Sequence, residues 1–143
     1  MTTVAQVLKQ KDAAVYTIPP KASVRSAIKL MAEKNIGALV VTNNNQEVIG
    51  ILSERDYTHK VVLQGRSSLT TNVDQIMTSD VITVTLDREI NECLKIMTDG
   101  HLRHLPVVEN GKLIAMIAIG DLVKAAMEDQ RQLIEQLKQY IAG

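Results

Sequence analysis

Apolar and polar residues follow two different spacings in the first half of the chain. Within 24–31, apolar residues recur at three- and four-residue intervals behind Ser23, a good N-cap, and this spacing predicts an amphipathic helix. Residues 38–42 and 48–52 are continuous apolar runs, which are typical of strands in a sheet covered on both faces. Residues 15–18 are also strand-like. The pattern therefore predicts strand, helix, strand, strand and then a second helix.

The same pattern occurs a second time. Met31 recurs as Met97 and Asp56 recurs as Asp121, so the second copy lies first 66 and then 65 residues further along the chain. The missing residue falls in a turn, where the second copy carries Asn-Gly at 110–111, the strongest short hairpin signal. Two copies of one unit, each too small to bury its own apolar face, are expected to pack together. We predict an α/β fold of two β-α-β-β-α repeats with pseudo-two-fold symmetry and a pair of related clefts.

The two copies are separated by a polar stretch. Residues 4–8, a short predicted lead helix, are matched by 73–77 ahead of the second copy, and 66–72 are predicted to form the linker. We therefore assign 1–68 to the first repeat with its lead helix, and 69–143 to the second repeat with a C-terminal extension.

The C-terminal extension carries an apolar stripe at helical spacing, formed by Leu133, Leu137, Tyr140 and Ile141. Such a stripe is expected to pack on something outside the core of the repeat. The sequence leaves two partners open, the chain itself and a second copy.

The composition disfavours nucleic acid as a partner. Of the 143 residues, 45% are hydrophobic, but none is Phe or Trp and only three are Tyr, so the core must be aliphatic and offers no stacking platform for bases. Lysine plus arginine balance aspartate plus glutamate at 16 each, with no basic run to follow a phosphate backbone.

The sequence also disfavours a membrane span and a disulfide. The longest apolar run, 113–119, is far shorter than the roughly 20 residues that cross a bilayer, and the N-terminus lacks the features of a secretory signal. The single cysteine, Cys93, lies on the apolar stripe of a predicted helix and is expected to be a core residue. We expect a soluble, cytoplasmic protein.

Candidate chemistry follows the last strand of the first copy. Ser53, Arg55 and Asp56 lie where a strand ends and a helix begins, a place where a carboxylate can bind ribose hydroxyls and the other groups can face phosphate. The alternative is structural, because Ser and Asp three residues apart also form a capping box at a helix start. These residues alone leave both interpretations open.

The second copy differs at these positions. Asp121 keeps the carboxylate, but Ala118 replaces the serine, while Arg103 and His104 stand where the first copy has Gly37 and Ala38. If the copies face each other, Arg103 and His104 are expected to make the cleft of Asp56 rich in cations. The other cleft, at Asp121, would be nearly neutral.

Taken together, residues 50–56, 103–107 and 119–121 resemble the motifs of a tandem pair of CBS domains, named after cystathionine β-synthase and called a Bateman module. The resemblance covers the whole chain except the C-terminal extension and implies a stand-alone CBS-domain protein. Members of that family bind AMP, ADP, ATP, S-adenosylmethionine or NAD(H) between the repeats and regulate a partner protein. The resemblance also implies a homodimer.

Carried over by position, the resemblance implies ribose contacts by Asp56 and Asp121. Contacts to adenine are implied for Thr17, Ile18, Pro19, Thr83 and Val84, and contacts to phosphate for Ser53, Arg103 and His104. The remaining candidate ligand-binding residues are Ala38, Arg55, Leu105 and Pro106. Ala118 departs from the family pattern, which has Ser or Thr there, and this disfavours a phosphorylated ligand in the second cleft.

We therefore expect a regulatory sensor of an adenine nucleotide, with AMP, ADP or ATP as ligand and no obligatory cofactor. The alternative is a scaffold that dimerises or docks on an enzyme without nucleotide, favoured if Ser53 and Asp56 serve only as a helix cap. An enzyme is disfavoured because no paired carboxylates and no nucleophile with a base occur. A metal site is disfavoured because only His59 accompanies His101 and His104.

Overall fold

The computed structural model describes residues 1–11 and 14–143 and divides into two compact units. The terminal unit contains Met1–Ala14, Thr83–Glu109 and Ile114–Gly143. The central unit contains Val15–Ile82 and Asn110–Leu113.

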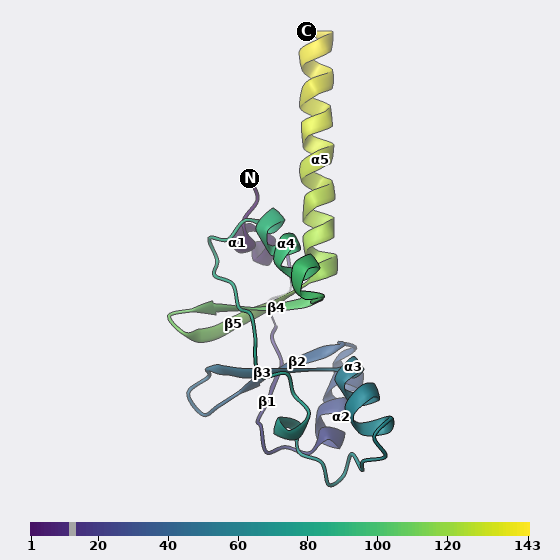
Figure 1. The fold of residues 1–143 in the computed structure, drawn as a ribbon. Coiled ribbons are helices and arrows are strands. Elements are labelled where there is room, and N and C mark those ends of the chain that lie inside the picture. Colours follow the sequence, from purple (N-terminus) through teal and green to yellow (C-terminus); the bar gives the residue numbers. More distant parts are fainter. Residues whose placement is uncertain (12–13) are drawn as a thin grey trace. The chain divides into compact units, whose positions relative to one another are not determined.

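The central unit contains a three-stranded sheet (Figure 1). Strand β1 (Thr17–Ile18) runs parallel to β2 (Ala38–Thr42), and β2 pairs in the antiparallel sense with β3 (Val48–Ser53). The register places Ala38 opposite Ser53, where β2 begins and β3 ends. This edge of the sheet therefore holds two of the predicted site residues.

Helix α2 (Val24–Lys34) confirms the helix predicted from the apolar spacing. The Ser23 hydroxyl accepts a hydrogen bond from the Ser26 N–H at 3.1 Å, as an N-cap does, and the helix ends at Asn35 with φ 54. Its apolar face is buried in one cluster with the sheet, formed by Val24, Ala27, Met31, Leu39, Val41 and Leu52.

After β3 the chain forms two short helical segments. Helix α3 (Glu54–Tyr57) continues into a π-helical turn, η1 (Thr58–Val62). Gly65 follows with φ 68, in the left-handed region that glycine adopts easily at helix ends. The π-helical turn is not among the predicted elements, because apolar spacing does not distinguish it from an α-helix.

The second copy of the sequence repeat has the same order of one helix and two strands. Helix α4 (Ile90–Gly100) precedes β4 (His104–Glu109) and β5 (Lys112–Ala118), and the turn between the strands has φ 52 and 76 at Asn110 and Gly111. These positive values confirm the predicted Asn-Gly hairpin turn. Val84 forms a parallel bridge to Val107, as β1 does to β2.

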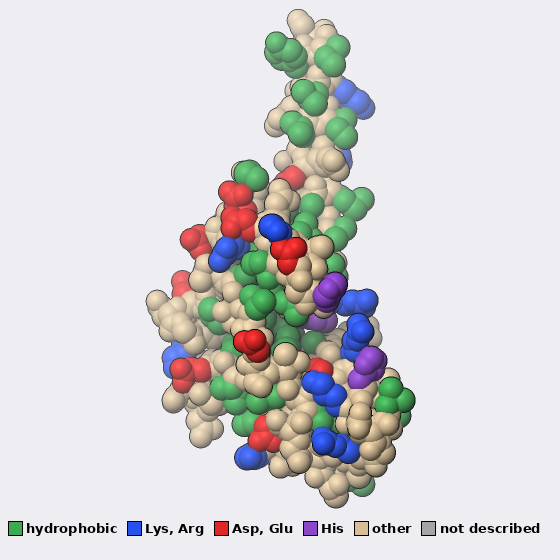
Figure 2. All heavy atoms as spheres, viewed as in Figure 1, with side chains coloured by type: hydrophobic (Ala, Val, Ile, Leu, Met, Phe, Trp, Pro, Cys, Tyr) green, Lys and Arg blue, Asp and Glu red, His purple; other side chains and the backbone are tan. Residues whose placement is uncertain are grey.

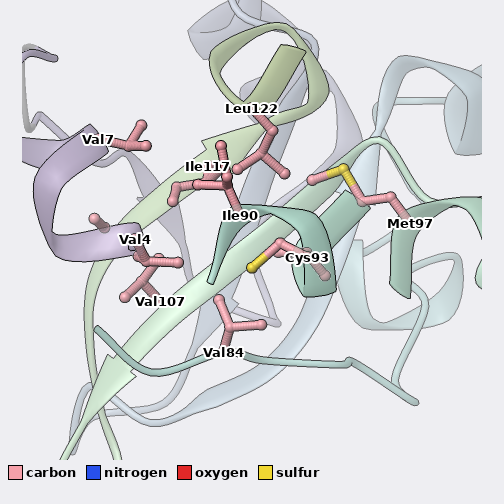
Figure 3. Packing of buried hydrophobic residues seen from close by; sticks show 11 residues of the cluster. Val4, Val7, Val84, Ile90, Cys93, Met97, Val107, Ile117 and Leu122 are labelled. Atoms are coloured by element: carbon pink, nitrogen blue, oxygen red, sulfur yellow. The ribbon is translucent and has the colours of Figure 1, made fainter. Parts of the chain in front are cut away.

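Figure 3 shows the core of the terminal unit, where side chains from α1, α4, β4, β5 and α5 converge. Cys93 lies within this cluster with no exposed surface, which confirms it as a core residue. The core is aliphatic apart from its sulfur-containing side chains, as the composition predicts.

Helix α1 (Val4–Lys9), which precedes the first copy, packs in the unit of the second copy. The N–H of Val4 donates to the Arg88 carbonyl at 2.8 Å, and the N–H of Ala5 donates to the Leu86 carbonyl at 3.0 Å. Val4 belongs to the terminal core.

The segment that precedes the second copy packs in the central unit, which contains the first copy. Val73, at the start of the 3-10 turn η2 (Val73–Gln75), and Ile76 belong to the central core. Thr78 and Ile51 exchange two backbone hydrogen bonds of 2.9 Å. The packing units are thus interleaved along the chain, whereas the boundaries 1–68 and 69–143 remain a prediction about the repeats.

Helix α5 (Ile119–Ala142) is packed at its beginning only. Leu122 is buried in the terminal core and the helix contacts α4, but every residue from Gln130 to Gly143 is exposed. Figure 1 shows this part of α5 projecting beyond α1 and α4. Within the described part of the chain, no helix is long and apolar enough to span a membrane.

Candidate functional site

One backbone hydrogen bond fixes the start of the helix in both copies. The Glu54 N–H donates to the Gly37 carbonyl at 3.0 Å, and the Ile119 N–H donates to the Arg103 carbonyl at 2.9 Å. These pairs are related by the same shifts of 65 and 66 residues as the sequence repeat. The two candidate aspartates, each two residues further on, therefore lie in the first turns of equivalent helices.

Asp56 and Ser53 form a reciprocal capping box at the start of α3. Asp56 Oδ2 accepts from the Ser53 N–H at 2.9 Å and from the Ser53 hydroxyl at 3.1 Å, while the Asp56 N–H donates to Ser53 Oγ at 3.1 Å. This is the structural alternative predicted from the sequence. It does not exclude ligand binding, but it means that the Ser53 hydroxyl is already engaged.

Lys60 holds the other oxygen of the same carboxylate. Its Nζ lies 3.0 Å from Asp56 Oδ1 and donates to the Ile76 carbonyl at 2.9 Å. The Asp56 side chain is 14% exposed. Oδ2 thus accepts two hydrogen bonds from Ser53, and the ion pair with Lys60 covers Oδ1.

Asp121 is bound differently in the second copy. Its Oδ2 accepts from the Ala118 N–H at 2.9 Å and from Lys11 Nζ at 2.7 Å, and Lys11 also donates to the Met116 carbonyl at 2.8 Å. The Asp121 side chain is 26% exposed, and Oδ1 accepts no hydrogen bond from the residues that the structure describes. Asp121 therefore offers two unused acceptor positions on one oxygen.

The two lysines were not among the predicted site residues. Lys60 has a local signal, because it lies four residues after Asp56 on the same helical stretch, where oppositely charged side chains meet. The equivalent residue of the second copy is Ala125. Lys11 reaches Asp121 from 110 residues away, through the interleaved packing of the lead segment, and no local pattern indicates this contact.

The environment of His104 disfavours its charged form. Burial is the main cause that lowers its pKa below the ordinary 6.5, and the nearby charges of Lys11 and Arg103 lower it further, against the opposing effect of Asp121. These effects disfavour the charged imidazolium, and a positive charge on His104 stays a prediction. The cations of this region are Arg103, which is exposed, and Lys11.

The predicted adenine contacts divide by exposure. Thr17 and Pro19 are exposed, and Thr83 is partly exposed. The side chains of Ile18, Val84 and Leu105 belong to the two cores, so that they can offer a ligand only their backbone groups. Ala38 and Pro106 are also buried, and the Pro106 carbonyl accepts from the Val84 N–H at 3.0 Å.

The predicted site residues fall into two sets. The central unit holds Thr17, Ile18, Pro19, Ala38, Ser53, Arg55 and Asp56, and the terminal unit holds Thr83, Val84, Arg103, His104, Leu105, Pro106 and Asp121. The approach of Arg103 and His104 to Asp56 stays a prediction.

Comparison with known proteins gives the same family for both copies. The family described as CBS domain matches residues 4–62 and again 73–128. The CBS domain-containing protein CBSX3, mitochondrial, of Arabidopsis thaliana is 38% identical over 150 residues, which covers 99% of this chain and 73% of that protein.

Solved structures of similar fold also contain CBS domains. A protein with CBS domains from Burkholderia ambifaria MC40-6 is 51% identical, with a TM-score of 0.85 over 90% of this chain and 96% of that one. The CBS domain pair of protein MJ0100 was solved with 5′-methylthioadenosine and S-adenosyl-L-methionine. It has a TM-score of 0.80 over 90% of this chain and 98% of that one, but at 20% identity it is similar in fold alone.

Proposed function

Because the chain belongs to the CBS-domain family, with both of its repeats matched, we propose that it is a regulatory module that binds an adenosine-containing ligand and signals its presence to a partner protein. AMP, ADP and ATP are the first candidates, which would make the module a sensor of cellular energy. S-adenosylmethionine and NAD(H) are the alternatives. We propose no catalytic step.

The observation that carries this proposal is the partly open carboxylate of Asp121. A ribose presents two adjacent hydroxyl donors, and Oδ1 of Asp121 has two unused acceptor positions beside a lysine that fixes Oδ2. At Asp56, Ser53 donates both of its hydrogen bonds to Oδ2, and the Lys60 ammonium covers Oδ1 at 3.0 Å. We therefore infer that Asp121, rather than Asp56, makes the stronger ribose contact.

Charged groups near Asp121 suit a phosphorylated ligand. Arg103 and Lys11 are cations in the same unit, and each ring nitrogen of His104 can take part in one hydrogen bond. The absence of a hydroxyl at Ala118 thus does not leave the second copy without phosphate partners. This interpretation reverses the expectation that the second copy is the weaker phosphate site.

Replacement of Asp121 by Ala tests the proposal. A charge-assisted hydrogen bond contributes roughly 1.5 to 3 kcal/mol, so Asp121→Ala should weaken AMP binding by about ten- to a hundredfold in a calorimetric titration. The control is Asp99→Ala, which removes an exposed carboxylate of α4 paired only with Lys95. Parent-like affinity of Asp121→Ala, at the same stoichiometry, would show that Asp121 is not a ribose ligand.

A nucleotide-independent scaffold is the second candidate, and the capping box of Ser53 and Asp56 favours it for the first copy. In the same titration, Asp56→Ala separates the two functions of this carboxylate. Loss of a cap costs about 1 kcal/mol of unfolding free energy. If Asp56→Ala loses this unfolding free energy but binds AMP with unchanged affinity, Asp56 is structural. If Asp121→Ala loses AMP binding but still dimerises, the scaffold role is separate from nucleotide binding.

A further inference from the structure

The C-terminal half of α5 is an apolar helix without a covering surface in its own unit. Figure 2 shows apolar side chains along this projection. Seven large apolar side chains of α5 are between 43% and 86% exposed: Val123, Met127, Leu133, Ile134, Leu137, Tyr140 and Ile141. An exposed patch of this kind is unusual for a monomer, and a helix gains most of its stability from packing. The segment therefore requires a partner surface.

The exposed side chains follow the heptad spacing of a coiled coil. Alternating steps of four and three residues connect Val123, Met127, Gln130, Ile134, Leu137 and Ile141. We call these six residues the seam. The side of α5 that packs on its own unit is a different one, formed by Leu122, Ala125 and Ala126.

From this pattern we propose that α5 pairs with the α5 of a second copy of the chain as a parallel, two-stranded coiled coil. The proposal is independent of nucleotide binding. Heptad position a is occupied by Met127, Ile134 and Ile141, and position d by Val123, Gln130 and Leu137. β-branched residues at a with Leu at d favour two parallel strands, and Ile134, Ile141 and Leu137 follow this rule.

The charges beside the seam also favour the parallel orientation. Position e carries Lys124, Arg131 and Lys138, all basic, whereas position g carries Ala126, Leu133 and Tyr140, all uncharged. In an antiparallel pair the e positions would face one another and repel. In a parallel pair each e position faces a g position, so the basic side chains meet no like charge.

Pairing with a second copy also suits the one polar residue of the seam. Gln130 is its single polar residue, and in a parallel homodimer it faces Gln130 of the partner subunit, where the two amides can hydrogen-bond to each other and fix the register. The seven exposed apolar side chains offer several hundred Å², of the order of the roughly 800 Å² per partner that stable interfaces bury.

Disulfide trapping tests which face of α5 meets the second copy. Gln130→Cys lies in the seam, whereas Gln132→Cys, two residues on, lies on the opposite, exposed side, and native Cys93 is buried. Under mild oxidation of the purified full chain we expect Gln130→Cys to form an intermolecular disulfide at least tenfold faster than Gln132→Cys. Equal rates, or no disulfide from Gln130→Cys, would overturn the proposal.

A second cysteine position tests the orientation. Leu137 lies near the end of the helix, so Leu137→Cys meets its equivalent only in a parallel pair, and Gln139→Cys is the matched control outside the seam. Rapid trapping of Leu137→Cys supports the parallel pair. Trapping of Gln130→Cys without trapping of Leu137→Cys would contradict it and indicate an antiparallel pair.

Charged substitutions provide the complementary test. In the Gln130→Cys background, Ile134→Glu with Leu137→Glu should slow disulfide formation at least tenfold, because it places repelling carboxylates in the seam. Gln132→Glu with Gln139→Glu adds the same charge outside the seam and should leave the rate unchanged. All four positions are exposed, so neither double variant disturbs the folded cores. Equal rates in both double variants would rule out the coiled coil.

Discussion

Two aspartates at equivalent positions of a repeat differ here in how much of each carboxylate is available. Ser53 donates two hydrogen bonds to Oδ2 of Asp56 and Lys60 is ion-paired with Oδ1, whereas Ala118 supplies only its N–H to Asp121. Oδ1 of Asp121 is open because Ala125 stands in place of Lys60, whereas the hydroxyl that Ala118 lacks donates to Oδ2 in the first copy. The chemistry of each residue is therefore decided by its neighbours and not by its identity.

His104 is also expected to make the unfolding free energy depend on pH. Its pKa in the folded protein lies below the value of about 6.5 in the unfolded chain, so between these two values the unfolded state binds more protons. The unfolding free energy should therefore fall as the pH is lowered through 6.5, and level off below the folded pKa. Urea unfolding at pH 7.5, 6.5 and 5.5 measures this slope.

His104→Gln should flatten that slope, because it removes the group that must stay neutral. His59→Gln, at an exposed position of η1, is the matched control and should retain the slope of the parent. An unchanged slope in His104→Gln would show that burial of this imidazole does not couple folding to protonation.

The two lead segments, α1 and η2, determine how the helices and strands of the two copies pack. Helix α1 completes the core of the terminal unit, and η2 completes the core of the central unit, so each copy is stabilised by the segment ahead of the other. This interleaving brings Lys11 to Asp121 and Ile76 to Lys60. Both candidate carboxylates are thus held by contacts that cross the sequence boundary of the repeats.

Val4 and Val73 are equivalent, fully buried residues of the two lead segments and offer a matched test. Val4→Ala should cost about 2 kcal/mol through lost burial and a cavity, and should speed amide hydrogen exchange in α4 and β4. Val73→Ala should instead speed exchange in β2 and β3. If Val4→Ala loosened β2 and β3 while α4 stayed protected, the interleaved packing would be incorrect.

Local patterns predicted most of the elements, and long-range contacts account for what they missed. The apolar spacing of α2 and α4, the strands and the Asn110–Gly111 turn follow from neighbours in sequence, and the structure confirms them. The capping alternative at Ser53 was also visible locally. The contact of Lys11 with Asp121, and the lowered pKa of His104 that follows from burial, depend on packing between distant segments.

The duplicated chain has two related but unequal candidate sites, and its C-terminal extension forms one projecting helix. The proposed adenosine site at Asp121 lies in the first turn of α5, the same helix that carries the proposed seam from Val123 to Ile141. A ligand bound at Asp121 would fix the start of α5, and α5 also forms the proposed contact with the second copy. This continuity offers a physical route by which occupancy could be signalled to a partner protein.

Binding of an adenosine compound is measured by calorimetric titration of the full chain with AMP, ADP, ATP, S-adenosylmethionine and NADH, with GMP as the control. We expect saturable binding of at least one adenosine compound and none of GMP, with a stabilisation of about 2.7 kcal/mol at a hundred times the dissociation constant. Absence of binding by all five adenosine compounds, or equal binding of GMP, would contradict the proposed function.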